Sequence, residues 1–394
     1  MSWIAGSRKF FSHRTQVLRF GASVVMVGTV LGAQSADRVF QGAMTSSGRN
    51  RPSINLAKDD LVTLSGLLHL RIPRSELVTR LRISDEELQR RLDLLVGEGL
   101  AKIAADNRVL PTSVVVTLED ARKYFRPDDR LVESAAQLIV KKLADVKARA
   151  RALPSLAEVP FESMSFFLLS DVLLDNWQIG NVERLFVKAE RTLRAGGRYY
   201  YTVLEKPAGD PTEPFGLYGN TGSQWGTVQV GLYGNDRFSG HTLLSVSDTS
   251  FNRMFGLPHS MSPKDARQQL ADAMVQALRT GDNPLTPTAR KALAQLSLMR
   301  NDRLTILLLR EDDYQALEGV ASVVTQDLIA LLEQNRARIL AVYQASPYAE
   351  ETAESEFLLC WYHFFYAAVT NQLHDQGVLD IPANGTVTYF VVPR

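Results

Sequence analysis

Hydrophobic positions recur at helical spacing in the stretch 55–116, and polar or proline-containing breaks divide it into short elements. A first helix is predicted where three leucines share one face, and Ile72-Pro73 ends it because proline disfavours helical geometry in the residue before it. A second short helix follows over Ser75 to Leu81. The leucines of the first helix are Leu61, Leu64 and Leu68.

A third helix is predicted to begin after Ser84, which stands three residues before Glu87. This spacing is that of a capping box, in which each side chain satisfies a backbone N–H group at the start of a helix. An apolar stripe then faces the first two helices, and two glycines permit the left-handed turn that ends the third. The stripe is Leu88, Leu92 and Leu95, and the glycines are Gly97 and Gly99.

Two strands are predicted next, Leu100 to Ile103 and Val114 to Val116, with Ala105 to Arg108 as the polar tip between them, since Asn and Asp tolerate turn geometry. Three helices and a hairpin in this order resemble the winged helix-turn-helix superfamily of transcription regulators. The likeness is carried by Ile83-Ser84-Asp85-Glu86-Glu87-Leu88 and Leu94-Leu95-Val96-Gly97-Glu98-Gly99-Leu100.

The resemblance implies that the third helix enters the major groove of DNA. Its nucleic-acid contacts would be Gln89, Arg90 and Arg91, with Arg108 at the hairpin tip. The charges oppose this, because five acidic side chains accompany two basic ones within 84–98, whereas DNA affinity comes from neutralising phosphates. The same fold also serves as a protein contact. DNA and a protein partner therefore both stay open.

The N-terminal residues 1–36 contain no acidic side chain, and basic residues precede an apolar run from Phe20 to Ala33. This is the layout of a secretory signal, which would export the chain after Asp37 and touch a membrane only through an uncleaved leader. The alternative is a disordered extension of a cytoplasmic protein whose working chain starts near Met44. The commonest use of the neighbouring module favours the cytoplasm.

The composition is that of an ordinary folded protein, with 394 residues, 45% hydrophobic content and a net charge of +1. We expect a leader over 1–53, a winged-helix domain over 54–126, a connecting helix over 127–153 and a body over 160–394. The connecting helix has an apolar stripe from Leu131 to Leu153, which either packs on its own chain or forms a homodimer.

The body contains an internal echo, because Phe215 to Asn220 has a counterpart in Val230 to Asn235. Gly-Asn after an apolar-aromatic pair is turn chemistry, so a two-strand meander explains the echo. The functional alternative is the rim of a ligand site, since loops rich in glycine and aromatic residues can close over small molecules. Its members would be Tyr218, Asn220, Trp225, Tyr233 and Asn235.

Catalytic chemistry is poorly served, and we expect neither an enzyme nor a cofactor. Ser170 after the strand-length apolar run Met164 to Leu169, together with His241, would give a hydrolase its nucleophile and base, but the G-x-S-x-G elbow is missing. The histidines lack metal-site spacing. The single cysteine, Cys360, cannot form an internal disulfide.

The last third is predicted to be mainly helical. Helices begin at Ser262-Pro263 and Thr286-Pro287, where a capping hydroxyl precedes proline. A buried strand follows over Arg303 to Leu309, and two long helices precede a terminal hairpin around Asn384-Gly385. That hairpin, with the helix before it, either echoes a winged helix over 357–392 or completes the sheet of the body.

These elements predict an α+β fold, with an N-terminal winged helix-turn-helix, a connecting helix and a larger mixed α/β body that has a small, mainly antiparallel sheet and C-terminal helices. The function predicted first is a non-enzymatic regulatory protein that binds DNA or a protein and senses a ligand or partner with its body. The alternatives are an exported binding or structural protein that uses the winged helix as a scaffold, and a Ser-dependent hydrolase.

Overall fold

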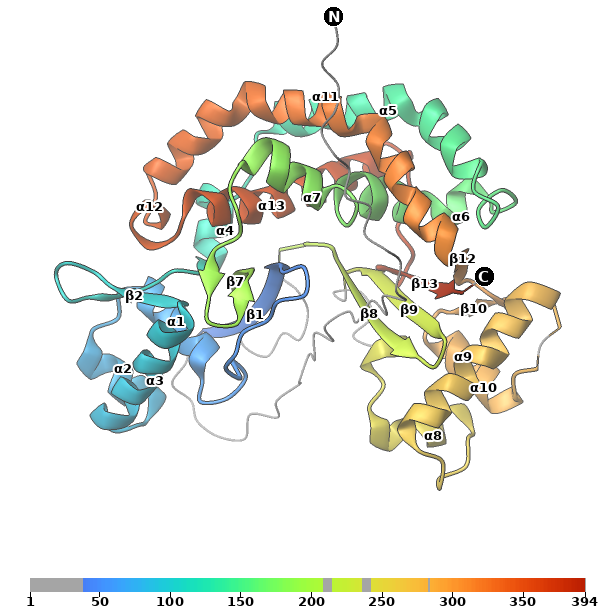
Figure 1. Cartoon of the computed structure of the whole chain (residues 1–394), viewed down its shortest axis with the longest axis horizontal. Coiled ribbons are helices and arrows are strands. Elements are labelled where there is room, and N and C mark those ends of the chain that lie inside the picture. Colours follow the sequence, from blue (N-terminus) through green and yellow to red (C-terminus); the bar gives the residue numbers. More distant parts are fainter. Residues whose placement is uncertain (1–37, 208–214, 236–241, 283, 394) are drawn as a thin grey trace, which may run out of the picture.

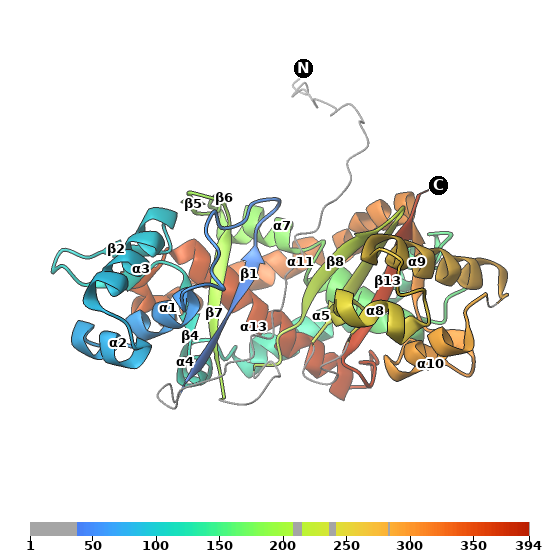
Figure 2. The same cartoon turned by 90° about the horizontal axis from the view of Figure 1, so that it is seen from below.

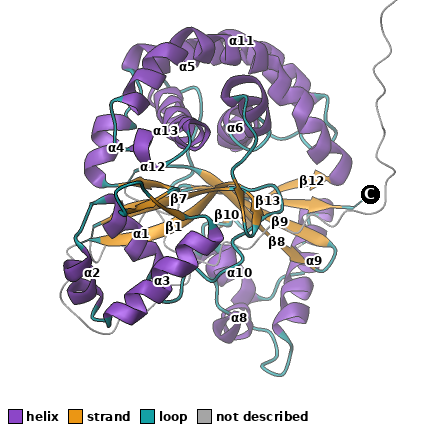
Figure 3. Ribbon diagram, turned by 60° about the vertical axis from the view of Figure 1, so that its left-hand side comes forward, coloured by secondary structure: helices purple, strands orange, loops and turns teal. Residues whose placement is uncertain are grey.

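The computed structural model of the protein describes residues 38–207, 215–235, 242–282 and 284–393. The chain is a mixed α/β protein with small sheets and C-terminal helices. The expected signal segment and His241 lie outside the described residues. Two sheets lie between an upper layer of long helices and two groups of shorter helices below (Figures 1 and 3).

The first half begins with strand β1, Val39–Ser46, followed by three helices and a two-stranded hairpin, which we call the N-terminal helical unit. Strand β4 then pairs in parallel with β7, and β1 pairs with β7 from the other side in antiparallel fashion, giving the order β1-β7-β4. The elements are α1 Leu61–His69, α2 Arg74–Leu81, α3 Asp85–Glu98, β2 Ala101–Ile103, β3 Val109–Pro111, β4 Val114–Val116 and β7 Tyr200–Lys206.

The second half repeats this plan. Strands β8 and β9 form a hairpin, and three helices with a short hairpin follow, which we call the C-terminal helical unit. Strand β12 pairs in parallel with β13, and β9 pairs with β13 from the other side in antiparallel fashion. The elements are β8 Gly219–Trp225, β9 Val228–Gly234, α8 Asp248–Phe255, α9 Pro263–Thr280, α10 Pro287–Gln295, β10 Met299–Arg300, β11 Arg303–Leu304, β12 Leu307–Arg310 and β13 Thr386–Val392.

Long helices join the halves and cover one face of both sheets (Figures 1 and 3). In the first half β4, which is parallel to β7, leads into this layer through α4 and α5. In the second half β12, which is parallel to β13, leads into it through α11. The members are α4 Leu118–Tyr124, α5 Asp129–Arg151, α6 Phe161–Phe166, α7 Ile179–Val182, α11 Glu311–Gln344, α12 Tyr348–Glu351, α13 Glu354–Asp375, and the π-helices η1 Phe167–Val172 and η2 Glu183–Val187. Helix α11 is long and apolar enough to cross a membrane by length and composition alone. In this structure it packs in the central core, which is the hydrophobic core between the long helices and the sheets.

Alternation along the strands divides the interior into three cores, because successive side chains point to opposite faces of a sheet. In β12, Leu307 and Leu309 face the long helices, whereas Leu308 packs toward the C-terminal helical unit. In β4, Val114 and Val116 face the long helices and Val115 faces the N-terminal helical unit. In both halves, therefore, alternate residues of the strand face the long helices, and the residue between them faces a helical unit.

One difference separates the two helical units. In the N-terminal unit the first helix, α1, lies against β1 and β7, whereas in the C-terminal unit the second helix, α9, lies against β8 and β9. In both units the last helix leads directly into the hairpin, as α3 into β2 and α10 into β10. The units lie at opposite ends of the molecule (Figures 1 and 2).

Several predictions of local structure are confirmed. The Ser84 hydroxyl accepts from the Glu87 backbone N–H (3.1 Å) at the start of α3, although Glu87 binds arginines instead of completing a capping box. Thr117 and Asp120, whose three-residue spacing likewise predicts a capped helix, form a capping box before α4. The two copies of Gly-Leu-Tyr-Gly-Asn do lie in an antiparallel pair of strands, in which Asn220 lies opposite Tyr233, but Gly219-Asn220 is part of β8 and not a turn, and the pair turns at Gly226.

Four expectations are corrected. Val114 to Val116 is not the second strand of the first hairpin, because that strand is Val109–Pro111 and the valines join the sheet of β7. The run Met164 to Leu169 is helical and not a strand. The strand prediction failed because a segment buried on all sides has no periodicity that distinguishes a helix from a strand. The expected leader contains the edge strand β1. No terminal hairpin forms around Asn384-Gly385, but Thr386–Val392 does complete the sheet of the body, as one of the two alternatives predicted, because β13 lies between β9 and β12.

The apolar stripe of α5 is used within the chain, where it packs against α11 and α13 in the central core. This agrees with the first of the two alternatives for the connecting helix. A homodimer through Leu131 to Leu153 would require a surface that the same chain already covers, so dimerisation has no support from this helix. The buried stripe consists of Leu131, Val132, Ala135, Ala136, Ile139, Val146 and Ala150.

Candidate functional site

Helix α3 has one face in the core of the N-terminal helical unit and the other exposed to solvent. Leu88, Leu92 and Leu95 pack against α1 and α2, and Gly99, with φ 83°, ends the helix in the left-handed conformation that glycine permits. The exposed face carries three acidic side chains, Asp85, Glu86 and Asp93. Of these, Asp85 and Glu86 lie in the first turn, where they complement the positive end of the helix dipole.

The two arginines predicted to contact nucleic acid are bound to carboxylates of the same unit. Arg90 Nη2 donates to Glu87 (2.7 Å) and Asp59 (2.8 Å). Arg91 is buried and donates to Glu87 (2.9 Å) and Asp60 (3.3 Å). Hydrogen bonds from both arginines lower the pKa of Glu87 to about 2. Carboxylates of the same unit therefore already neutralise the charges of Arg90 and Arg91.

The other two predicted residues are also bound within the chain. Gln89 donates to Asp93 (2.8 Å) and accepts from Arg74 (3.0 Å). Arg108, at the tip of the β2–β3 hairpin, is bound to Asp106 and to Glu350 of α12 (2.7 Å to Glu350). The hairpin tip is thus attached to the long-helix layer. The structure brings Gln89, Arg90 and Arg91 onto one helix but places Arg108 against the rest of the protein.

A buried histidine attaches α1 to the long-helix layer. His69 Nε2 lies 3.0 Å from Asp120 of α4, and Nδ1 lies 2.6 Å from Glu351 of α12. The Tyr348 ring stacks on the imidazole, with centroids 5.3 Å apart. Burial by itself would lower the pKa of His69, but the hydrogen bonds to Asp120 and Glu351 outweigh it and raise the pKa to about 9. The charged imidazole therefore holds the N-terminal helical unit in place.

The five residues predicted to form a ligand rim lie in two places. Tyr218, Asn220 and Tyr233 gather beneath the long helices, whereas the Trp225 ring packs on Phe251 of the C-terminal helical unit, with centroids 5.5 Å apart. Asn235 is buried and its side-chain amide donates to the Leu217 carbonyl. Four of the five side chains are at most 3% exposed. They belong to the interior rather than to the rim of an open site.

Two carboxylates that sequence reasoning did not select stand in this buried group. Asn220 Nδ2 donates to both carboxylate oxygens of Asp171 (3.1 and 3.0 Å) and to Tyr389 (2.9 Å). Burial and the nearby charge of Asp175 raise the pKa of Asp171 well above its usual value, and burial raises the pKa of Asp175 to about 7. The polar pair Ser170-Asp171 inside an apolar run was the only available signal.

The buried group is not arranged as a hydrolase. The Ser170 hydroxyl is buried and lies 2.6 Å from the Tyr233 hydroxyl and 2.7 Å from the Thr370 hydroxyl. His241 lies outside the described residues. A catalytic nucleophile needs a base within hydrogen-bond reach, and the partners of this serine are hydroxyl groups. The raised carboxyl pKa values favour a neutral hydrogen-bonded network inside the core.

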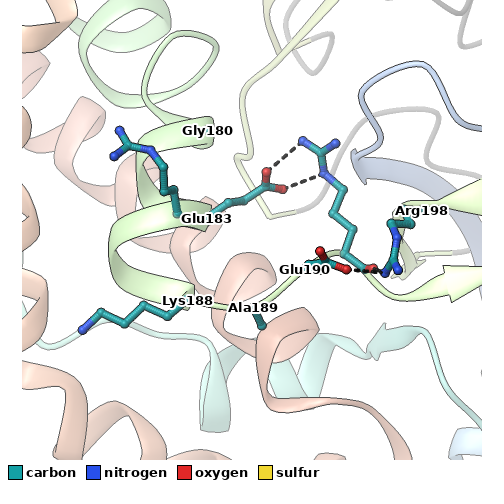
Figure 4. A pocket seen from close by; sticks show the side chains of 8 residues that line it. Gly180, Glu183, Lys188, Ala189, Glu190 and Arg198 are labelled. Carbon is teal, nitrogen blue, oxygen red and sulfur yellow. Dashed lines mark hydrogen bonds and ion pairs between the residues drawn. The ribbon is translucent and has the colours of Figure 1, made fainter. Parts of the chain in front are cut away.

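An open surface depression of about 570 Å³ lies beside η2 (Figure 4). Its charges are satisfied by neighbours, because Arg191 contacts Glu183 (2.8 Å), Arg198 contacts Glu190 (3.0 Å) and Lys188 contacts Glu333 of α11. No group of three metal-ligating side chains occurs among the described residues. An enclosed small-molecule site is therefore not visible in that part of the chain.

Comparisons of the chain with protein families, with curated proteins and with solved structures return no match. The features that carry most information are the two helical units at the ends of the molecule and the charges on their outer faces.

Proposed function

We propose that this chain is a non-enzymatic regulatory protein that acts by binding DNA, and that its N-terminal helical unit is a winged helix-turn-helix. The observation that carries the proposal is the order of elements: α1, α2 and α3 are followed directly by the antiparallel hairpin β2–β3. In winged-helix proteins the helix before the hairpin is the one that enters the major groove. A second unit of the chain, α8, α9 and α10 followed by the β10–β11 hairpin, has the same order of elements, so each unit offers a helix and a hairpin for this role.

The arrangement of the whole molecule supports a binding role. A second unit of three helices and a hairpin stands at the opposite end, and the two sheets and the long-helix layer hold both units. We propose that the body acts as a spacer that fixes the distance between two contact surfaces. We further propose a cytoplasmic location, where DNA is accessible.

The direct test is a titration of the purified full-length chain into a labelled duplex DNA, followed by fluorescence anisotropy. We expect saturable binding that weakens between about 50 and 200 mM salt, because counterions are released when basic side chains neutralise phosphates. Absence of binding at the lowest salt concentration would overturn the proposal. The intact mass of the protein from its own host tests the location, since removal of the signal-like segment would show export.

A second function is favoured by one observation, the acidic outer face of α3 with its compensated arginines. Such a surface suits a basic protein partner better than phosphate. A photo-crosslinking residue in place of Glu86 should then capture one defined partner in the native host, whereas the same residue in place of exposed Glu133 on α5 should not. Equal capture at both positions would refute a contact through α3.

A further inference from the structure

The β10–β11 hairpin carries two arginines at directly paired positions. Arg300 lies opposite Arg303, and Asn301 and Asp302 form the two-residue turn with φ of 51° and 60°. Positive φ at both central residues is the type I′ geometry that fits a tight hairpin. Like charges directly opposite one another on a hairpin repel and weaken it. The pair is therefore costly unless an anion lies between or beside the two guanidinium groups.

The carboxylate of Asp302, in the turn, does not neutralise the charges of Arg300 and Arg303. Asp302 instead accepts from Arg290 of α10, at 3.3 and 3.5 Å. This ion pair connects α10 to the tip of the hairpin. Lys291, next to Arg290 in the helix, and both hairpin arginines are exposed and have no ion-pair partner among the residues that the structure describes.

The two units differ sharply in charge at equivalent positions. Residues 287–304, from the start of α10 to the end of the hairpin, contain four basic side chains and one acidic, a balance of +3. Residues 85–111, from the start of α3 to the end of its hairpin, contain four basic and six acidic, a balance of −2. In the N-terminal unit the predicted contacts are bound to carboxylates, whereas three cations of the C-terminal unit are exposed and uncompensated.

We propose that the C-terminal helical unit, and not α3, is the main DNA-binding surface, with Arg300 and Arg303 holding backbone phosphates and Lys291 a further phosphate. The inference rests on the proposed function and assigns its site. A guanidinium matches a phosphate group with two parallel N–H···O bonds, and a lysine adds a compact positive charge. A phosphate between the paired arginines removes their repulsion. Helix α10 and the hairpin together present cations to one duplex, as a helix and wing do.

The test compares two variants of the full-length chain that lose the same charge. The first, Lys291→Ala with Arg300→Ala and Arg303→Ala, removes the proposed contacts. The matched control, Arg90→Ala with Lys102→Ala and Arg108→Ala, removes three exposed cations from the N-terminal unit.

Binding of a labelled duplex is measured by anisotropy over a salt series for both variants and the native chain. For the first variant we expect the slope of log affinity against log salt to fall by up to about 2.7, since each phosphate contact contributes about 0.9. At 0.1 M salt this corresponds to roughly an eightfold loss of affinity per contact. The control should stay within a small factor of the native chain.

Each outcome is assigned. An equal loss of DNA affinity in both variants means that only overall charge matters, and it overturns the inference. A loss of affinity confined to the control also overturns the inference, but it leaves the proposed function standing with α3 as its site. No binding by the native chain overturns the proposed function itself. Circular dichroism checks that each variant is folded.

A single charge reversal separates binding from folding. Arg303→Glu turns the like-charged pair with Arg300 into an opposite-charged one, so we expect a higher thermal midpoint together with at least tenfold weaker DNA binding. A purely structural role predicts that stability and binding change in the same direction. A lower midpoint, or unchanged binding in a folded protein, would refute the assignment of Arg303.

Discussion

Replacement of His69 by glutamine tests whether a charged imidazole holds the N-terminal helical unit to the long-helix layer. In the structure the ring lies between two carboxylates, those of Asp120 and Glu351, and is only 6% exposed. These hydrogen bonds raise the pKa of His69 from 6.5 to about 9 against the opposing effect of burial. The folded protein therefore binds this proton more tightly than the unfolded chain does.

The sign of the pH dependence follows from that difference. Because the folded pKa is the higher one, the stabilisation is fully present below pH 6.5 and is lost as the pH rises through about 9. A pKa shift from 6.5 to about 9 corresponds to roughly 3 kcal/mol at most. Between about pH 6 and pH 8.5 the native chain should lose about 2 kcal/mol from this residue.

The assay is urea unfolding of the native chain and His69→Gln at both pH values. We expect the stability difference between them to shrink by about 2 to 3 kcal/mol on going to the higher pH. His259→Gln, which removes an exposed imidazole that lies between no carboxylates, is the matched control for the loss of a histidine. A difference for His69→Gln that is the same at both pH values would refute a charged imidazole between the carboxylates.

Two further substitutions test the interior, each with its own control. Gly231→Ala places a Cβ 2.2 Å from the ring of Tyr389 and should lower the unfolding free energy by about 1 to 3 kcal/mol. The control, Gly97→Ala in α3, meets no neighbouring atom within 4 Å and should raise the unfolding free energy by up to about 1 kcal/mol. Denaturant unfolding measures both variants, and an unchanged stability of Gly231→Ala would show that the Tyr389 ring can move aside. Arg194→Met removes the guanidinium that lies 2.5 Å from the buried carboxyl of Glu356, together with bonds to the Gly99 carbonyl and the Thr112 hydroxyl. Burial raises the pKa of Glu356 to about 7, so we expect a cost of about 3 to 5 kcal/mol that is larger at pH 8 than at pH 6. Adding Glu356→Gln should recover the part due to the carboxyl, and no recovery at pH 8 would refute the charge argument.

The parts of the fold that were predicted from sequence are those set by local chemistry. Ser84 and Thr117 cap helices through bonds to residues three positions away, so the spacing alone reveals them. The proline-started helices at Ser262-Pro263 and Thr286-Pro287 follow the same logic. In each case the residues that determine the structure are neighbours in the chain.

The parts that were missed depend on distant residues. Val115 pairs with Val203 of β7, and nothing near Val115 distinguishes this strand from the second arm of a hairpin. The terminal strand around Tyr389 lies between strands from two other parts of the chain, so its turn signal at Asn384-Gly385 suggested a partner that the fold does not use. Loop closure over such separations leaves no local pattern.

The candidate site was missed for a different reason. The resemblance directed attention to α3, and the sequence does show its excess of acids, but it does not show that Arg108 reaches Glu350 on a helix formed far along the chain. The repeated plan of strands and helices in the C-terminal half has no obvious sequence echo. Its short hairpin, with two residues in each strand, is below the length at which alternation can be read.

The two helical units show how the same architecture can be stabilised in opposite ways. In the N-terminal unit the charges on α3 and its hairpin bind one another and the body, so that the contacts of Glu87 and Arg108 strengthen the fold and leave little positive charge for a partner. In the C-terminal unit the hairpin keeps Arg300 beside Arg303 although an acid at either position would be more favourable for folding. Repulsion that folding does not require, on an exposed surface, is what an anion-binding site would be expected to show, and this is why the DNA contact is assigned to that end of the molecule.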